Sequence, residues 1–204
     1  VWKDRQAAKD QSTDLISTLV NGEATKNMLP NEFLGNMLLL IVGGNDTTRN
    51  SISGGVLALN ENQDEYNKLR NNHALVPKMV PEIIRWQTPV AHMCRTAMAD
   101  VNIGDKQISK GDRVVMWYIS GNRDESVIDK ANEFIIDRRA PRHHLSFGYG
   151  IHRCVGNRLG EMQLTILWEE IVKRYNKIDV VGEPKYLRSN FIHGITDLPV
   201  RIAA

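Results

Sequence analysis

Cysteine is scarce in this sequence: of 204 residues, only Cys94 and Cys154 are cysteines. Because the two lie far apart in unrelated contexts, the sequence argues against a disulfide framework and favours a reducing compartment. An excess of one charge is lacking too, since 26 Lys and Arg residues stand against 24 Asp and Glu residues, with no long basic run. This balance argues against nucleic acid or an anionic membrane as a partner.

Long apolar runs are also missing. The longest, residues 33–44, is broken by Asn36 and is too short to cross a bilayer, and the sequence shows no basic-then-apolar leader with a cleavage site. These absences predict a soluble, cytoplasmic protein without a membrane span. The remaining composition, 42% hydrophobic and 25% charged, is ordinary for a globular chain that buries a core.

The apolar pattern predicts a mainly helical chain with small β-sheets. Helices are expected over residues 6–19, from Pro30 to Leu59, over residues 82–86, and after Cys154. The pattern of the second helix is interrupted at Gly-Gly-Asn-Asp-Thr-Thr (43–48). Pro81 is expected to mark the beginning or a bend of the third helix, because proline lacks the N–H that a helix interior needs.

Strands and a long loop are expected between the last two helices. Residues 101–120 alternate and then fill with β-branched and aromatic residues around glycine turns, which predicts hairpin strands. Residues 121–150 lack periodicity apart from one extended piece, 134–138, and a long ordered loop usually serves a site. The last helix is expected to bury one stripe: Leu159, Met162, Ile166, Leu167 and Ile171. Short strands and turns are expected over residues 179–202.

Cys154 stands at the entrance of that last helix, in the stretch FGYGIHRCVG (147–156). A helix amino terminus offers unpaired N–H donors and a partial positive charge, which favour a thiolate over a thiol. This placement fits a thiolate that binds the metal of a haem. Two other interpretations stay open: a small buried structural cysteine, and a catalytic cysteine with a histidine base such as His152.

The neighbours of Cys154 agree with a flat ligand that carries carboxylates. Gly148, Gly150 and Gly156 let the backbone bend tightly and approach a planar group closely. His152 and Arg153 are basic, and a basic side chain here would pair with a carboxylate of the bound group.

These residues resemble a known family. The stretch 147–156 is similar to the cysteine-ligand loop of the cytochrome P450 haem-thiolate monooxygenases. GGNDTT (43–48) resembles the oxygen-binding helix segment of that family, Glu82 with Arg85 resembles its Glu-x-x-Arg pair, and the three motifs occur in the family's order. Because family members are roughly twice this length, the resemblance implies a partial cytochrome P450 domain over residues 1–204, the carboxy-terminal portion of the fold, with the amino-terminal half absent.

The resemblance implies roles around haem b. Cys154 would be the axial ligand of the haem iron, and Asp46 with Thr47 would be the acid and alcohol pair that delivers protons during activation of O2. The cofactor would further contact residues of the cysteine stretch and two basic residues that pair with its propionates: Phe147, Gly150, Gly156, Arg95 and His152.

A structural network is implied as well. In the family the Glu82 and Arg85 pair is structural rather than catalytic, although on spacing alone it would be a surface ion pair worth under about 1 kcal/mol. Its third partner is expected to be Arg138, with Arg139 as the alternative. The network would hold the cysteine stretch beneath the haem.

The implied reaction inserts one oxygen atom into an unactivated C–H bond, with NAD(P)H electrons delivered by a ferredoxin reductase and a ferredoxin. PEIIRWQTPVAHM, VVMWYISGNRDE and HRCVGNRLGEMQL resemble the soluble bacterial branch that hydroxylates terminal carbons of medium-chain alkanes and related fatty chains, and there Val90, Ala91 and Met93 would line the pocket for a small hydrophobic substrate. Cys94 and Gly160 depart from that branch, where a basic residue and an alanine are expected. The alternatives are a P450 for another small hydrophobic molecule such as a terpene, a peroxide-using or isomerising relative, and a haem-binding protein without turnover.

Overall fold

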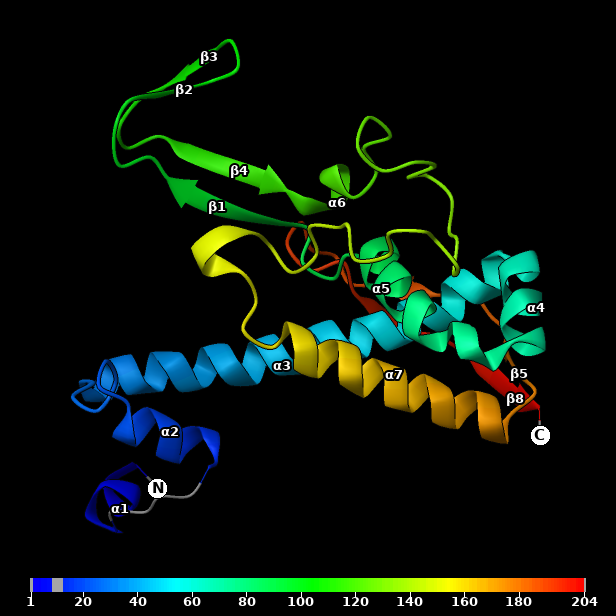
Figure 1. Cartoon of the computed structure of the whole chain (residues 1–204), viewed down its shortest axis with the longest axis horizontal. Helices are drawn as coiled ribbons and strands as arrows, with labels where there is room; N and C mark the ends of the chain where they lie inside the picture. The colour runs from blue at the N-terminus through cyan, green and yellow to red at the C-terminus, as the bar shows by residue number, and fades with distance from the viewer. Residues whose placement is uncertain (1, 9–12, 204) are drawn as a thin grey trace. The chain divides into compact units, whose positions relative to one another are not determined.

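The computed structural model describes residues 2–8 and 13–203. The chain divides into two compact units, residues 1–43 and residues 44–204 (Figure 1). Among the described residues, no helix combines the length and the apolar character that a membrane span requires. The expectation of a mainly helical chain with small sheets is confirmed.

The first unit contains α1 (Trp2–Ala8), α2 (Leu15–Asn21) and the beginning of α3 (Pro30–Glu61). The prediction of one helix over residues 6–19 is wrong: Asp14 has extended backbone angles and begins a new helix, its side chain accepting hydrogen bonds from the N–H groups of Ile16 and Ser17. An aspartate in this position caps a helix by satisfying donors that have no intrahelical partner. Residues 9–12 of the predicted helix lie outside the described part.

The long helix α3 begins at Pro30, as predicted, and runs to Glu61. The interruption of its apolar pattern at residues 43–48 is not an interruption of the helix, because the helical assignment is continuous there. Its buried positions all follow Arg49, whereas Leu34, Leu38, Ile41 and Val42 are exposed. The amphipathic pattern therefore predicted the helix correctly, but only the part after residue 49 buries its apolar face within the described structure.

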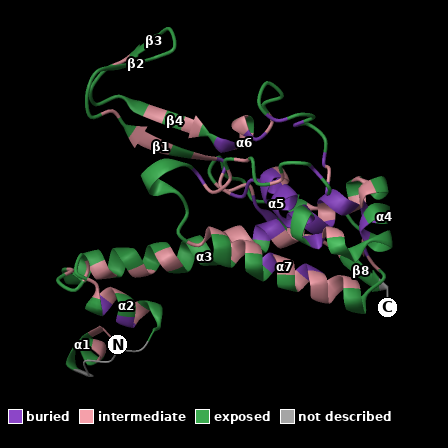
Figure 2. Ribbon diagram, in the orientation of Figure 1, coloured by how far each residue is buried: buried purple, intermediate pink, exposed green. Residues whose placement is uncertain are grey.

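In the second unit α3 is followed by α4 (Gln63–Asn71), a 3-10 turn (His73–Leu75) and α5 (Val76–Gln87). The long helix α7 (Asn157–Arg174) comes after the first four strands and before the last four. The buried residues gather on α5 and on the end of α3 (Figure 2). The core cluster includes Leu59, Leu69, Met79, Ile83, Phe134, Ile136, Leu164 and Trp168. Gly55 lets α3 come close to this core, because a Cβ there would lie 2.8 Å from Ile83 Cδ1 and 3.0 Å from Trp168 Cζ2.

Helix α5 begins earlier than predicted, at Val76, so Pro81 lies inside it rather than at its start. A proline inside a helix removes its own N–H from the ladder and its ring crowds the carbonyl four residues earlier, and burial of most of α5 offsets these costs. The helix ends before Pro89, as predicted. Thr88 follows it with a left-handed φ of 42° and donates its N–H to the Ile84 carbonyl.

Eight short strands form four two-stranded antiparallel sheets in the described residues. The predicted hairpin is confirmed as β2 (Val101–Ile103) with β3 (Lys106–Ile108), and the next strand, β4 (Arg113–Trp117), pairs with β1 (His92–Thr96). In the predicted tail, β5 (Lys177–Val180) pairs with β8 (Val200–Ala203), and β6 (Lys185–Tyr186) pairs with β7 (Ile195–Asp197).

The segment between β4 and α7 is mostly irregular, as predicted. It contains α6 (Tyr118–Gly121) and a 3-10 turn (Gly150–His152), and residues 134–138, predicted to be extended, are assigned no strand. Helix α7 is confirmed, but its predicted stripe is only partly right: Ile171 packs against the core cluster, whereas Leu159, Met162 and Ile166 are exposed. The fully buried side chains of α7 are Leu164 and Trp168. Leu164 and Trp168 belong to the core cluster that also holds residues of α5 and of the end of α3, whereas the face with Leu159, Met162 and Ile166 stays exposed.

Candidate functional site

Glu82 and Arg85 form a completely buried ion pair on α5. Arg85 Nε donates to Glu82 Oε2 at 2.8 Å and Nη2 to Oε1 at 2.7 Å, and both side chains are 0% exposed. The remaining Arg85 donors reach the carbonyls of Asn122, Ala131 and Glu133 at 2.7, 2.8 and 2.9 Å. All five guanidinium N–H groups of Arg85 are therefore used, and α5 is tied to the irregular segment.

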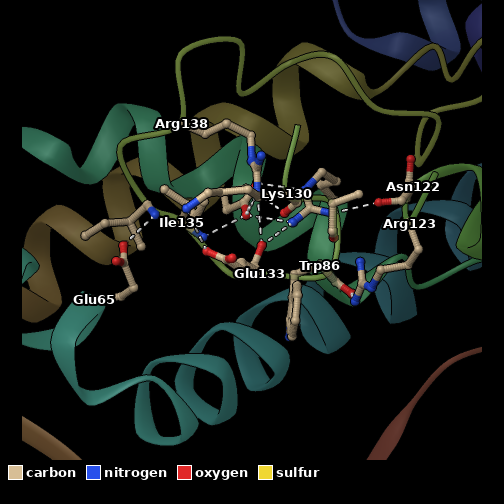
Figure 3. Close-up of polar contacts among 12 residues, drawn as sticks. Glu65, Trp86, Asn122, Arg123, Lys130, Glu133, Ile135 and Arg138 are labelled. Atoms are coloured by element: carbon tan, nitrogen blue, oxygen red, sulfur yellow. Dashed lines mark hydrogen bonds and ion pairs between the residues drawn. The ribbon is translucent and has the colours of Figure 1, made fainter. Parts of the chain in front are cut away.

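Arg138, the predicted third partner, lies in that segment near Lys130 and Glu133 (Figure 3) and pairs with Glu82. Its Nε donates to Glu82 Oε2 at 3.0 Å and its Nη2 to Oε1 at 3.3 Å, and further donors reach the carbonyls of Asp129, Lys130 and Glu133. The Ile135 N–H also donates to Glu82 Oε1, at 2.9 Å. Arg139, the alternative partner, is exposed. The family resemblance thus predicted three residues that the structure brings into contact.

The charge of Glu82 is held by these donors. Burial raises the pKa of its carboxyl, but the hydrogen bonds from Arg85 and Arg138, with the charge of Arg85 and the Ile135 N–H, outweigh burial and leave the pKa below its ordinary value of 4.5. Glu82 is therefore ionised at neutral pH, and one carboxylate balances part of the charge of two buried arginines.

A further arginine beside this network, Arg123, was not predicted from the sequence. Arg123 stacks over the Trp86 ring, with its Cζ 4.0 Å from the ring centroid, and its Nη2 donates to the Trp86 carbonyl at 2.9 Å. Burial, followed by the nearby charge of Arg85, lowers the pKa of Arg123 to about 10. The side chain stays protonated at neutral pH, where a cation–π contact stabilises it.

Cys154 lies in what we call the cysteine loop (Phe147–Gly156), directly before α7. Its backbone N–H donates to the Phe147 carbonyl at 2.8 Å, so the two ends of the loop are joined, and its thiol-bearing side chain is exposed. Gly148 is buried at φ 67°, where a Cβ would lie 3.1 Å from the Tyr118 hydroxyl, so a side chain there would be strained. Phe147 packs against the core cluster and anchors the start of the loop.

Three large side chains close to Cys154 in the sequence also face solvent. Tyr149, Ile151 and Val155 are 82%, 97% and 88% exposed. Gly156, at the amino end of α7, leaves room beside Cys154, since a Cβ there would lie 3.9 Å from the cysteine Sγ. Gly150, at φ 73°, would meet no described atom within 4 Å if it carried a Cβ. An exposed thiol with open glycine backbone beside it is suited to a flat ligand with a central metal.

The other predicted haem contacts are not brought to Cys154 by any hydrogen bond or ion pair among the described residues. Arg95 lies on β1, half-buried, and its Nη1 donates to the Cys94 carbonyl at 2.9 Å. His152 is exposed in the 3-10 turn two residues before Cys154.

Asp46 and Thr47 lie on α3, half-buried, just after Gly43 and Gly44. The Asp46 carboxylate pairs with Arg49 Nη2 at 2.9 Å, one helical turn further on, and the Thr47 carbonyl accepts from Ser51 Oγ at 2.9 Å. No atom of the described residues would lie within 4 Å of a Cβ at Gly43 or Gly44. The segment therefore places a carboxylic acid and an alcohol next to two glycines, Gly43 and Gly44, which leave open space beside the helix.

An open cavity of about 470 Å³ lies beside the segments 89–91 and 191–193, which are joined by hydrogen bonds from the Ala91 N–H to the Phe191 carbonyl and from the His193 N–H to the Pro89 carbonyl, both 2.9 Å. Ala91, Trp117, Ile119, Leu187 and Ile192 give it a mostly apolar lining. Of the three residues predicted to line a substrate pocket, Ala91 lines this cavity, whereas Val90 and Met93 are not among its described lining residues. A second cavity, about 290 Å³ between α4 and α7, contains none of the predicted site residues.

Comparison with known proteins places these features in a family. The family model for Cytochrome P450 matches residues 1–190. Linalool 8-monooxygenase of Pseudomonas putida is 42% identical over 188 residues, which are 92% of this chain and 46% of that protein. The chain thus spans about half the length of the curated relatives it matches.

Solved structures agree with the fold. Cytochrome P450-153 from Novosphingobium aromaticivorans superposes with a TM-score of 0.91 at 48% identity, over 98% of this chain and 50% of that one. CYP153D17 from Sphingomonas sp. PAMC 26605 gives a TM-score of 0.90 at 47% identity, over 100% of this chain and 52% of that one. With the matched motifs, these likenesses show that the chain belongs to the cytochrome P450 family and has the fold of a portion of its members.

Proposed function

We propose that the protein containing this chain is a haem-thiolate monooxygenase in which Cys154 is the axial ligand of haem iron. The observation that carries this proposal is the cysteine loop: its thiol is exposed, and the hydrogen bond from the Cys154 N–H to the Phe147 carbonyl joins its ends. The residues fit the cofactor, since the thiol is accessible and the glycines beside it leave the approach open. The family match implies the same cofactor.

When bound, the haem would supply the iron at which dioxygen is activated and the C–H bond is oxidised. The chain supplies what surrounds it: Cys154 would hold the metal through its sulfur, and the Glu82 network holds the segment that leads into the cysteine loop. Arg95 and His152 would pair with the propionates, and Phe147, Gly150 and Gly156 would shape the loop against the ring. Asp46 and Thr47 would hold and pass protons.

The proton-delivery role has a direct test. Thr47→Ala removes the hydroxyl that would pass a proton, so we expect oxygen and NAD(P)H use to continue while the share that ends in hydroxylated product falls. Ser51→Ala, which removes a hydroxyl bonded to the Thr47 carbonyl on the same helix, is the matched control. Unchanged coupling in Thr47→Ala would contradict the assigned role.

The electron donor we propose is a ferredoxin reduced by an NAD(P)H-dependent reductase. Between Arg139 and Gly160 the sequence has four arginines, three histidines and no Asp or Glu, and all four arginines are exposed. A basic surface around the cysteine loop would steer an acidic partner to it. Arg158→Glu should raise the KM for an acidic ferredoxin at low salt while kcat with saturating ferredoxin changes little; an unchanged KM would remove this support.

For the substrate we propose a medium-chain alkane or fatty acid, hydroxylated at its terminal carbon. The apolar cavity of about 470 Å³ is within the size range of small-molecule sites. A terpene is the second candidate, because a relative at 42% identity is named linalool 8-monooxygenase. Product analysis with matched alkanes, fatty acids and linalool would decide: a terminal alcohol from the chains supports the first class, and turnover of linalool alone supports the second. Absence of any product with redox partners present would favour a haem protein without turnover.

A further inference from the structure

Asn122, directly after α6, joins three segments that are distant in the sequence. Its Nδ2 donates to Thr88 Oγ1 and to Ser146 Oγ, both at 2.8 Å, and its Oδ1 accepts from the Leu145 N–H at 2.6 Å. Its own carbonyl accepts from Arg85 Nη1 at 2.7 Å, and the side chain is 0% exposed. One buried residue therefore contacts the end of α5, the Glu82 network and the segment that enters the cysteine loop.

The orientation of the Asn122 amide is fixed by its partners. The Leu145 N–H can only donate, so the oxygen of the amide must face it, and both Nδ2 hydrogens then point to hydroxyl oxygens. Those hydroxyls donate their own hydrogens elsewhere: Thr88 Oγ1 to the Arg85 carbonyl at 2.6 Å and Ser146 Oγ to the Ile84 carbonyl at 2.8 Å. The network is fully satisfied, and a satisfied buried network is rigid.

From Leu145 the hydrogen bonds continue to Cys154. The Gly148 N–H donates to the Leu145 carbonyl at 2.7 Å, and the Cys154 N–H donates to the Phe147 carbonyl at 2.8 Å. Asn122 therefore fixes Leu145 and Ser146, the two residues before the cysteine loop, and the loop's own bonds transmit that position to the cysteine.

We propose that Asn122 is a positioning residue for the cysteine loop, which couples the buried Glu82–Arg85–Arg138 network to the place where Cys154 meets the iron. The inference rests on the proposed function, in that the thiolate of Cys154 is the iron ligand. Asn122 contacts neither cofactor nor substrate in this role; it acts through the backbone of Leu145 and the hydroxyl of Ser146.

Asn122→Ala tests the proposal, and Asn60→Ala is its matched control. Asn60 also makes three side-chain bonds, to the Val56 and Ile178 carbonyls at 2.8 and 2.9 Å and from the Val180 N–H at 3.0 Å, but it fixes β5 rather than the cysteine loop. Asn122→Asp keeps an acceptor for the Leu145 N–H and loses both donors. The variants are made in the chain fused to the amino-terminal half of the Novosphingobium relative.

Two readouts are needed: amide hydrogen exchange over residues 145–154, and the fraction of the ferrous carbon-monoxide complex with the red-shifted Soret band of a thiolate ligand. We expect exchange about tenfold faster in Asn122→Ala, since a lost net hydrogen bond is worth on the order of a factor of ten in an opening equilibrium, together with a smaller red-shifted fraction. Asn122→Asp should lie between, and Asn60→Ala should match the unsubstituted protein.

Wild-type exchange over 145–154 in Asn122→Ala, or equal effects in Asn60→Ala, would overturn the proposal. If Asn122→Ala does not accumulate, Asn122→Asp carries the same comparison. A haem-loaded, unsubstituted fusion without the red-shifted band would instead overturn the proposed function, and hydrogen exchange would still decide whether Asn122 orders the loop.

Discussion

At the scale of single residues, Glu82 is the group whose charge the fold most depends on. Within the described part of the chain, it is the one carboxylate that pairs with Arg85 and Arg138, which are 0% and 8% exposed. Removing one partner of a buried ion pair leaves an uncompensated charge inside the protein, which costs much more than a surface pair is worth.

Glu82→Gln should therefore lower the free energy of unfolding by about 3–5 kcal/mol. Glu65→Gln is the control: Glu65 accepts from the Ile136 N–H at 2.9 Å, a bond that an amide oxygen can keep, and pairs with a largely exposed Lys68. Its loss should stay under about 1 kcal/mol. Urea unfolding measures both, and equal losses would mean that the buried charge is not what stabilises the network.

His144 gives a prediction for pH. Burial, then the charges of Arg153 and Arg85, lower the pKa of His144 from 6.5 to about 4, and its Nδ1 lies 3.2 Å from the Ser146 nitrogen, whose N–H donates to it. Between these two pKa values the unfolded chain binds a proton that the folded chain does not. The contribution of His144 to the free energy of unfolding is therefore fully present above pH 6.5 and is lost as the pH decreases toward 4.

The slope should be about 1.4 kcal/mol per pH unit within that window. His144→Asn, which keeps an acceptor for the Ser146 N–H, should flatten the dependence measured by urea unfolding, and the exposed neighbour His143→Asn should not change it. A slope that His144→Asn leaves intact would assign the dependence to another group.

The residue scale also shows what the sequence could predict. The spacing of Glu82 and Arg85 alone indicated a surface pair, and only the family resemblance indicated a buried network with Arg138. Asn122, Thr88 and Ser146 were not predicted, because their contacts join positions 23 to 34 residues apart through a segment without periodicity. Hydroxyl and amide contacts of this kind leave no pattern in a single sequence.

At the scale of elements, glycine pairs in α3 have different surroundings. Gly43 and Gly44 would meet no described atom if they carried a Cβ, whereas Gly54 and Gly55 would collide with Gln87, Ile83 and Trp168. The first pair was noted in the sequence because it lies in the segment that resembles the oxygen-binding motif. The second pair was missed, and it is the one that close packing of α3 against α5 and α7 requires.

Gly55→Ala should therefore destabilise the chain by about 1–3 kcal/mol, because the added methyl overfills a packed core. Gly160→Ala, in α7, should stabilise it by about 1 kcal/mol, since no described atom lies within 4 Å of the added Cβ and alanine is the better helix former. Thermal and urea unfolding would show opposite shifts. Shifts of the same sign would mean that helix propensity or packing has been assigned wrongly to one of the two sites.

Element boundaries show why part of the pattern misled. Asp14 begins a new helix within a segment that looks uniformly helical, and Pro81 lies inside α5 because the apolar contacts of α5 outweigh one missing N–H donor. The partly wrong stripe of α7 has a similar origin: periodicity shows that a face is apolar, but the identity of the neighbouring element decides which of two apolar faces is buried.

At the scale of the whole molecule, the chain covers about half of the relatives it matches, and large apolar side chains are exposed on α7 and close to Cys154 in the sequence. In its relatives the rest of the polypeptide is present. Ligation of haem iron by the Cys154 thiolate is therefore best tested with the chain joined to the amino-terminal half of the Novosphingobium protein.

The most direct measurement is the carbon-monoxide difference spectrum of the dithionite-reduced fusion, recorded beside Cys154→Ser and with Cys94→Ser as the control for a half-buried thiol elsewhere. Thiolate ligation by Cys154 predicts a red-shifted Soret band in the unsubstituted fusion and in Cys94→Ser, and its loss in Cys154→Ser. A folded, haem-loaded fusion without that band, or a band that survives Cys154→Ser, would contradict it.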